Sequence, residues 1–455
     1  MEPVVRKCLS LLFLILVLVP VLGLHPLAAN AEVVAIRADR LVDTERGSVL
    51  LKPTVIVRDT KIEMVGSDLA IPKTARVIDL PGKTILPGLI DCHTHLTDET
   101  VLDPVVELQR TAAQKAFESI PYARRTVMAG FTTVRDVGTY RALVDVALRD
   151  AIARGDVLGP RMFVAGAYVT ITGGAGSLSG FAPDITVPWD LRFGQADGPW
   201  QVRQRIRELA HRKADFIKIL ATGAVLTHGS NPGAQEFTFE EMKAAVEEAG
   251  KFGLKVAAHA HSAAGIKEAV RAGVASIEHG THLDDEGIAL MKEHGTYLVA
   301  DIYNDEYIQG EGKKRGMPKD FLEHDQDLGR IQRENFRKAV RAGVKMAFGT
   351  DAGVFPHGQN ARQFAWMVKY GMTPLQAVQS ATIDAARLLG QDAELGSLTA
   401  GKRADIIAVE GDPMADVSLL EKVDFVMKDG AIIKNSSGSK AGSVSRAKKQ
   451  HTGAY

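Results

Sequence analysis

Five of the 13 histidines in this chain lie at the carboxyl ends of apolar segments that are typical of β-strands. A lysine lies within another such segment, and an aspartate ends a further one. These residues are His93, His95, Lys218, His259, His261, His279 and Asp351. Imidazole nitrogens and carboxylate oxygens suit zinc, and manganese, cobalt and iron accept the same atoms. The set therefore predicts a metal centre.

Two pairs of these histidines are separated by a single residue, His93 with His95 and His259 with His261. Because alternate residues of a strand point to the same side, each pair can direct two imidazoles toward one divalent ion. Such a pair alone also occurs on protein surfaces. The prediction of a metal site therefore depends on the whole set and on its order along the chain.

Lys218 lies in the middle of the apolar segment 216–220. An ammonium group buried there carries a large desolvation cost unless it is paired or chemically altered. One interpretation is an ion pair with a nearby carboxylate. The other is reaction with carbon dioxide to give a carbamate, N6-carboxylysine, whose two oxygens could bridge two metal ions.

The elements that must position these residues lie between about residues 85 and 390, where apolar segments alternate with amphipathic helical stretches. Parallel strands buried on both faces have this pattern. Eight units predict a (β/α)8 barrel, whose active site forms at the carboxyl ends of the strands. The expected strands are 84–90, 131–135, 162–165, 216–220, 255–258, 274–277, 297–300 and 344–348.

Short strands rich in valine and isoleucine occur before this region, in 32–84, and after it, in 393–436. Since the ends of a chain often lie close together, these segments can form one domain. We therefore expect an α/β fold: a (β/α)8 TIM barrel over 85–392 with a small β-sandwich domain formed from the N- and C-terminal segments. Residues 437–455 are polar and predicted to be disordered.

The first 31 residues have the features of a cleavable secretory signal peptide. Arg6 and Lys7 precede an apolar run over 9–24, and the sequence Ala29-Asn30-Ala31 follows it. An uncleaved membrane anchor is the alternative, but the run is shorter than the roughly 20 residues that a spanning helix needs. We therefore expect export to the periplasm or the medium, without stable membrane association after cleavage.

Charge and cysteine content exclude other classes of partner and crosslink. The formal net charge is zero, which gives no indication of a nucleic-acid partner. Without the first 31 residues Cys92 is the single cysteine, so no intramolecular disulfide can form. We interpret Cys92 as a packed strand residue.

The motifs around these residues resemble the amidohydrolase superfamily. More narrowly, they are similar to its imidazolonepropionase-like branch, which contains prolidase-type dipeptidases, carboxypeptidases and ochratoxinase-like amidases. The resemblance covers almost the whole chain after residue 31. It is carried by segments 86–95, 130–136, 215–218, 259–261, 276–280, 349–352, 401–405 and 426–430.

This resemblance implies two metal ions, with zinc the expected metal. The first would be bound by His93, His95, Asp351 and the carbamate of Lys218. The second would be bound by the same carbamate, His279 and a histidine after the fifth strand. The family pattern favours His259 as that ligand and leaves His261 to contact the substrate. In segment 173–176 relatives often have a histidine at the third position, where this chain has alanine, so no substrate contact is carried over there.

The same resemblance implies hydrolysis of the amide of a C-terminal amino acid. The substrate would be a dipeptide or an N-acyl amino acid, including N-aryl-acyl phenylalanine amides of the ochratoxin type. A hydroxide bridging the metals would attack the carbonyl, Asp351 would carry its proton to the leaving amine, and His261 would stabilise the oxyanion. Tyr168, His228 and Arg135 are candidate substrate contacts, each with a structural role as the alternative.

Two other functions are compatible with a barrel of this kind. A mononuclear cyclic-amide hydrolase or deaminase usually lacks the lysine of the fourth strand, so Lys218 argues against it. A binding protein on an inactive barrel would lack ligands, and none is missing from this set. The family resemblance further implies a homo-oligomer.

Overall fold

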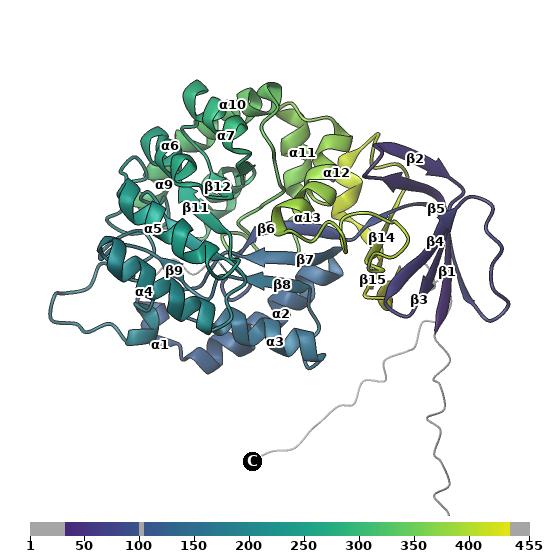
Figure 1. The fold of residues 1–455 in the computed structure, drawn as a ribbon, viewed down its shortest axis with the longest axis horizontal. Helices are drawn as coiled ribbons and strands as arrows, with labels where there is room; N and C mark the ends of the chain where they lie inside the picture. Colours follow the sequence, from purple (N-terminus) through teal and green to yellow (C-terminus); the bar gives the residue numbers. More distant parts are fainter. Residues whose placement is uncertain (1–31, 100–103, 437–455) are drawn as a thin grey trace, which may run out of the picture.

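The computed structural model describes residues 32–99 and 104–436. Figure 1 shows two parts, a group of parallel strands surrounded by helices and a mixed sheet made from both ends of the described chain. The predicted signal peptide and the predicted C-terminal tail lie outside these residues. Within the described ranges, no helix has the length and apolarity to cross a membrane.

The mixed sheet is the expected small β domain, and its eight strands form one continuous sheet. The N- and C-terminal segments join at β5, which is parallel to β1 and antiparallel to β14. The apolar side chains of the mixed sheet, such as Ile36, Val55 and Phe425, pack into a core that is separate from the barrel core. The strands are β1 (Val33–Asp43), β2 (Ser48–Leu51), β3 (Thr54–Arg58), β4 (Lys61–Gly66), β5 (Arg76–Pro87), β14 (Ile406–Glu410), β15 (Val423–Lys428) and β16 (Ala431–Asn435).

The barrel strands form a three-stranded and a five-stranded parallel sheet. In β10, Ile217 and Ile219 pack outward against the helices, so the intervening Lys218 points into the barrel. The strands are β6 (Leu89–Thr94), β7 (Phe131–Asp136), β8 (Arg161–Val164), β9 (Tyr168–Val169), β10 (Ile217–Leu220), β11 (Val256–Ala260), β12 (Ser276–His279) and β13 (Tyr297–Val299).

The two barrel sheets meet at two places. The third expected strand is divided, since β8 pairs with β7 whereas β9 pairs with β10. The eighth, expected at 344–348, is not a regular strand. It contributes single bridges from Met346 to Leu298 and from Ala352 to Thr94. It is irregular because Phe348 N donates to Ser380 O, 2.9 Å away, and not to a neighbouring strand.

The first barrel strand begins later than expected, because segment 84–90 is divided between the two parts of the molecule. β5 belongs to the mixed sheet and ends at Pro87, and β6 begins at Leu89. Between them lies Gly88, where a Cβ atom would come within 2.1 Å of Thr132 Oγ1. Only glycine therefore allows β6 to leave the mixed sheet so close to β7. Cys92 of β6 is fully buried in an apolar cluster, as expected.

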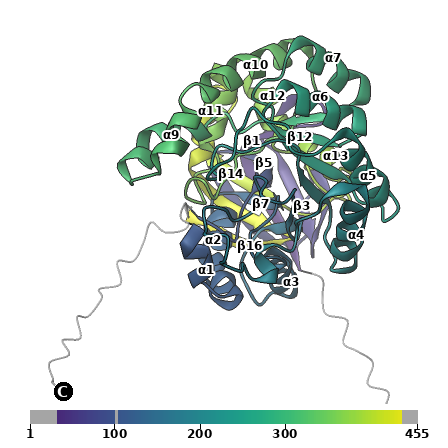
Figure 2. The same cartoon turned by 90° about the vertical axis from the view of Figure 1, so that its left-hand side faces the viewer.

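Helices surround the barrel strands, as Figure 2 shows, and the largest apolar cluster lies between the two layers. Capping boxes fix the first turns of α2, α5 and α12. The helices are α1 (Pro104–Gln109), α2 (Ala112–Met128), α3 (Val144–Arg154), α4 (Gly198–His211), α5 (Phe239–Gly250), α6 (Ala263–Ala272), α7 (Asp285–His294), α8 (Asn304–Tyr307), α9 (Lys319–Asp325), α10 (Leu328–Ala342), α11 (Arg362–Lys369), α12 (Pro374–Ser380) and α13 (Ile383–Leu389), with short 3-10 or π turns at Trp189–Leu191, Ile308–Gly312 and Val417–Glu421.

Arg161 of β8 ties the barrel to the mixed sheet. Its guanidinium contacts Asp405 at 2.7 Å and Asp429 at 2.6 Å, and Asp405 is buried. We expect Arg161→Gln to lower the free energy of unfolding by about 3 kcal/mol, because it leaves a buried carboxylate without its cation. Urea unfolding measures this loss. The exposed pair of Arg154 with Asp156 provides the control, since Arg154→Gln should cost less than about 1 kcal/mol. Equal losses would contradict the prediction.

Candidate metal centre

One cavity of about 180 Å³ lies at the carboxyl ends of the barrel strands. All seven residues singled out from the sequence line it, although they come from four different strands and one irregular segment. His93 and His95 lie at the end of β6, Lys218 on β10, His259 and His261 at the end of β11, His279 at the end of β12, and Asp351 after segment 345–350.

His93, His95 and Asp351 form one group of potential ligands. Asp351 Oδ1 lies 3.4 Å from His93 Nε2 and 3.0 Å from His95 Nε2. A ligand atom of His279 completes a second set with His93 and Asp351, all within 4.8 Å of one another. Ligands that each lie about 2 Å from a zinc ion are separated by distances of this order. The group could therefore hold one divalent ion.

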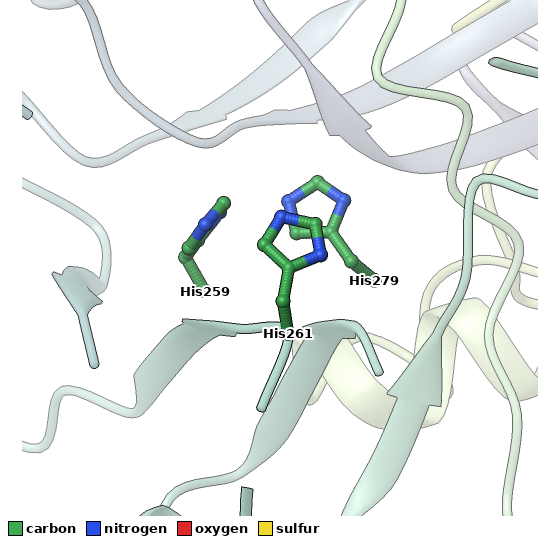
Figure 3. Close-up of side chains that lie close together, drawn as sticks. All are labelled: His259, His261 and His279. Carbon is green, nitrogen blue, oxygen red and sulfur yellow. The ribbon is translucent and has the colours of Figure 1, made fainter. Parts of the chain in front are cut away.

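His259, His261 and His279 form a second group, shown in Figure 3, in which the three rings face a common space. Their ring centroids are 4.5 to 4.9 Å apart, and one nitrogen of each lies within 4.8 Å of the others. Because the His259 and His261 rings lie at similar distances from His279, 4.5 and 4.9 Å, this geometry leaves the choice between them as ligands open.

Buried carboxylates fix the tautomers of His93 and His279. His93 Nδ1 lies 2.8 Å from Glu278 Oε2, and His279 Nδ1 lies 2.9 Å from Asp301 Oδ1. An ionised carboxylate only accepts hydrogen bonds, so each Nδ1 carries the proton and donates it. Each Nε2 is left with a free lone pair, which is the state a metal ligand needs.

Backbone carbonyls have the same effect on His95 and His259. His95 Nδ1 lies 2.8 Å from Gly138 O, and His259 Nε2 lies 3.1 Å from Gly223 O. A carbonyl cannot donate, so these nitrogens carry the protons. His95 therefore presents Nε2 as a ligand, whereas His259 presents Nδ1.

The Lys218 side chain is 2% exposed, and among the described residues its Nζ has no hydrogen-bond partner. Lys218 also forms no ion pair with any carboxylate among the described residues. Burial lowers the pKa of Lys218 to about 8, so a fraction of the amine is unprotonated near neutral pH. An unpartnered, partly neutral amine among converging imidazoles fits a carbamate ligand and not the ion pair.

Two residues of the centre adopt the left-handed backbone conformation, which is strained for residues other than glycine. The φ angle is 67° at His279 and 57° at Asp351. Such strain costs on the order of 1–3 kcal/mol per residue and clusters at functional sites. It turns both side chains toward the cavity at the ends of their segments.

The candidate substrate contacts have different surroundings. Tyr168 lines the cavity, with its hydroxyl 3.0 Å from His95 Nδ1, and His261 lines it with Nδ1 2.8 Å from Thr281 Oγ1. His228 is not among the cavity-lining residues. Its Nδ1 contacts Asp320 Oδ2 at 2.8 Å, so it ties its loop to α9.

Arg135 is also absent from the cavity lining. Its position is consistent with the structural role that was the alternative to a substrate contact. It is 4% exposed inside the barrel, where it contacts Glu278 Oε1 at 2.7 Å. Because successive side chains of a strand point to opposite faces, β7 directs Arg135 into the barrel. The sequence does not show how far below the cavity the side chain lies.

Sequence reasoning missed Glu278, Asp301 and Asn304. Asn304 Nδ2 donates to Asp301 Oδ2 at 2.9 Å and to Asp351 Oδ2 at 3.0 Å, which links the two groups of ligands. Glu278 had a usable signal, since a carboxylate beside His279 in an apolar segment needs partners. Asp301 and Asn304 had none, because they follow β13 in a polar stretch.

Above the metal-binding groups, the cavity wall is largely apolar. It comes from the end of β10 and the loop after it, from the α8–α10 segment, and from the residues that follow Asp351. The apolar lining residues are Leu220, Ala224, Val225, Leu226, Ile308, Leu328 and Val354.

The model of the amidohydrolase family matches residues 84–433. The ochratoxinase of Aspergillus niger is 32% identical over 430 residues, which cover 89% of this chain and 87% of that protein.

Two solved structures are similar over 89% of this chain and 100% of their own length. A Xaa-Pro dipeptidase with methionine bound in its active site has a TM-score of 0.84 and 38% identity. A prolidase complexed with N-methylphosphonate-L-proline has a TM-score of 0.83 and 30% identity.

Proposed function

This chain belongs to the amidohydrolase family and is a hydrolase that acts on amide bonds, and from this premise we propose that it releases the C-terminal amino acid of dipeptides or N-acyl amino acids with the help of two divalent ions. One observation carries the proposal. Five imidazoles, Asp351 and the unpartnered amine of Lys218 line one cavity.

The residues present fit a binuclear centre. His93, His95 and Asp351 would hold one ion, and His279 with His259 or His261 would hold the other. Lys218, as a carbamate, would contribute one oxygen to each, which gives its Nζ substituent the partners that the amine lacks. Zinc is the metal that this donor set favours. When bound, two such ions activate a water molecule and polarise the amide carbonyl.

Asp351 is the residue placed to move a proton. Asn304 donates to its Oδ2, so Oδ1 is the oxygen that faces His93 and His95. We assign to Asp351 the transfer of the proton of the attacking water to the leaving amine. His261, whose Nδ1 contacts Thr281, would donate from its other nitrogen to the developing oxyanion if it is not the ligand.

The apolar wall bears on the substrate. Leu226, Ile308 and Val354 would remove an apolar side chain from water, and each CH₂ group buried contributes about 0.8 kcal/mol. The related structures contain bound methionine and a proline derivative, both of which have apolar side chains. We therefore favour apolar leaving amino acids, with N-aryl-acyl phenylalanine amides as one candidate class.

The test is amine release from a library of dipeptides and N-acyl amino acids, with zinc and bicarbonate present. We expect the fastest release of apolar amino acids, loss of activity after treatment with a chelator, and recovery when zinc is returned. A His228→Ala variant, altered outside the cavity, should retain activity. Activity confined to cyclic amides, or ammonia release from heterocycles, would contradict the proposal. Full activity in the presence of chelator would do so too.

A further inference from the structure

Arg135 of β7 uses its guanidinium entirely inside the barrel. Nε donates to Cys92 O at 2.6 Å, NH1 donates to Ser276 Oγ at 3.0 Å, and NH2 donates to Glu278 Oε1 at 2.7 Å. The first of these contacts reaches β6 and the other two reach β12. Arg135 is thus fixed from two sides, next to the strands that carry His93 and His279, without lining the cavity.

Glu278 is completely buried, and both of its oxygens are occupied. Oε1 accepts from Arg135 and from Ser276 Oγ, the latter at 2.5 Å, and Oε2 accepts from His93 Nδ1 at 2.8 Å. A guanidinium can only donate hydrogen bonds, so the Arg135 contact at Oε1 favours the ionised form of this buried side chain. Glu278 is therefore a carboxylate, and Arg135 supplies its compensating charge.

We propose that Arg135 is a positioning residue for the metal centre, which acts through Glu278 to hold His93 with Nδ1 protonated and Nε2 facing Asp351. A carboxylate behind a ligand imidazole orients the ring and sets its tautomer. A buried carboxylate without a cation would take up a proton or rotate toward another donor. In either case Glu278 would hold His93 less firmly. This inference rests on the metal centre of the proposed function.

The pairing of Arg135 with Glu278 also keeps Glu278 from forming an ion pair with Lys218. Lys218 and Glu278 are both buried, yet no hydrogen bond joins them among the described residues. Because Arg135, Ser276 and His93 occupy the Glu278 oxygens, the amine stays unpaired. Its lone pair can then form a bond to the carbon of carbon dioxide, and one proton leaves to give the carbamate. Without Arg135, Glu278 has an oxygen free to accept from the Lys218 ammonium.

The central experiment is a double-mutant cycle on metal affinity, measured by competition with a chromophoric zinc chelator. We expect Arg135→Gln and Glu278→Gln each to weaken binding by about 10- to 100-fold, as changes behind metal ligands do. The double variant should bind zinc as tightly as the single variant with the lower zinc affinity, because Arg135 acts through Glu278. Arg135→Lys, which keeps a cation, should recover part of the affinity.

Arg161→Gln is the matched control. Arg161 is also a barrel arginine paired with carboxylates. Its partners lie at strand ends of the mixed sheet, Asp405 directly before β14 and Asp429 directly after β15. This variant should lose stability without a change in metal affinity. A structural role of Arg135 alone would make the two arginine variants behave alike.

A crystal structure of Arg135→Gln provides a second measurement, independent of activity and affinity. We expect an ion pair between Lys218 and Glu278 and no carbamate on Lys218. If the wild-type protein binds metal but Arg135→Gln has unchanged affinity, or if the two substitutions are additive, this inference is wrong and the proposed function stands. A wild-type protein that binds no metal would contradict both.

Discussion

Replacement of Lys218 by methionine is expected to lower kcat/KM for amide hydrolysis by about three orders of magnitude or more, because the proposed binuclear centre would lose the ligand shared by its two ions. The folded protein should at the same time become more stable. Lys218 Nζ is buried and has no partner within the described residues, so an apolar side chain of similar length removes a desolvation cost.

This opposite change in activity and stability distinguishes a ligand from a structural lysine. Activity is measured by amine release, and stability by thermal unfolding of metal-free protein. Lys218→Glu serves as the matched variant, since its carboxylate is a shorter substitute for the carbamate and should recover part of the metal binding. A Lys218→Met protein that unfolds at a much lower temperature would identify a structural role. Unchanged hydrolysis would exclude the carbamate.

Asp351→Asn is expected to lower kcat by about 10²- to 10⁴-fold with a small change in KM, because an amide cannot accept the proton of the attacking water. The substituted side chain has the same shape, and its amide oxygen can still accept from Asn304. The loss should therefore exceed any effect of misplacement. Steady-state kinetics with metal content measured on the same sample separates proton transfer from metal loss.

The control for Asp351 is Asp320→Asn. Asp320 lies on α9, outside the cavity, and its carboxylate contacts His228. This variant should leave kcat within a factor of about two, as expected for a surface change. Full turnover by metal-loaded Asp351→Asn would remove Asp351 from the role of proton carrier.

The position of the site could be predicted from the sequence because the chemistry follows strand periodicity. His93 and His95, like His259 and His261, share a side through their spacing of two residues. Their placement at the carboxyl ends of parallel strands brings them to one end of a barrel. Lys218 was recognisable because a cation within an apolar segment needs an explanation that packing alone cannot give.

The residues behind the ligands could not be predicted, because their roles arise from contacts between strands that are distant in sequence. Arg135 meets Glu278 across 143 positions of the chain. Likewise, nothing in a polar loop sequence shows whether His228 faces the cavity or contacts Asp320 of α9. The strand boundaries at Gly88 and in segment 344–348 depended on single close contacts and hydrogen bonds.

We propose that the cavity holds two divalent ions that share Lys218 as a ligand. Elemental analysis of the purified protein, after incubation with zinc and bicarbonate and removal of unbound metal, tests it most directly. We expect about two ions per chain for the wild-type protein. One ion per chain would indicate a mononuclear cyclic-amide hydrolase or deaminase, and none would indicate a barrel without metal chemistry. Either result would contradict a binuclear centre.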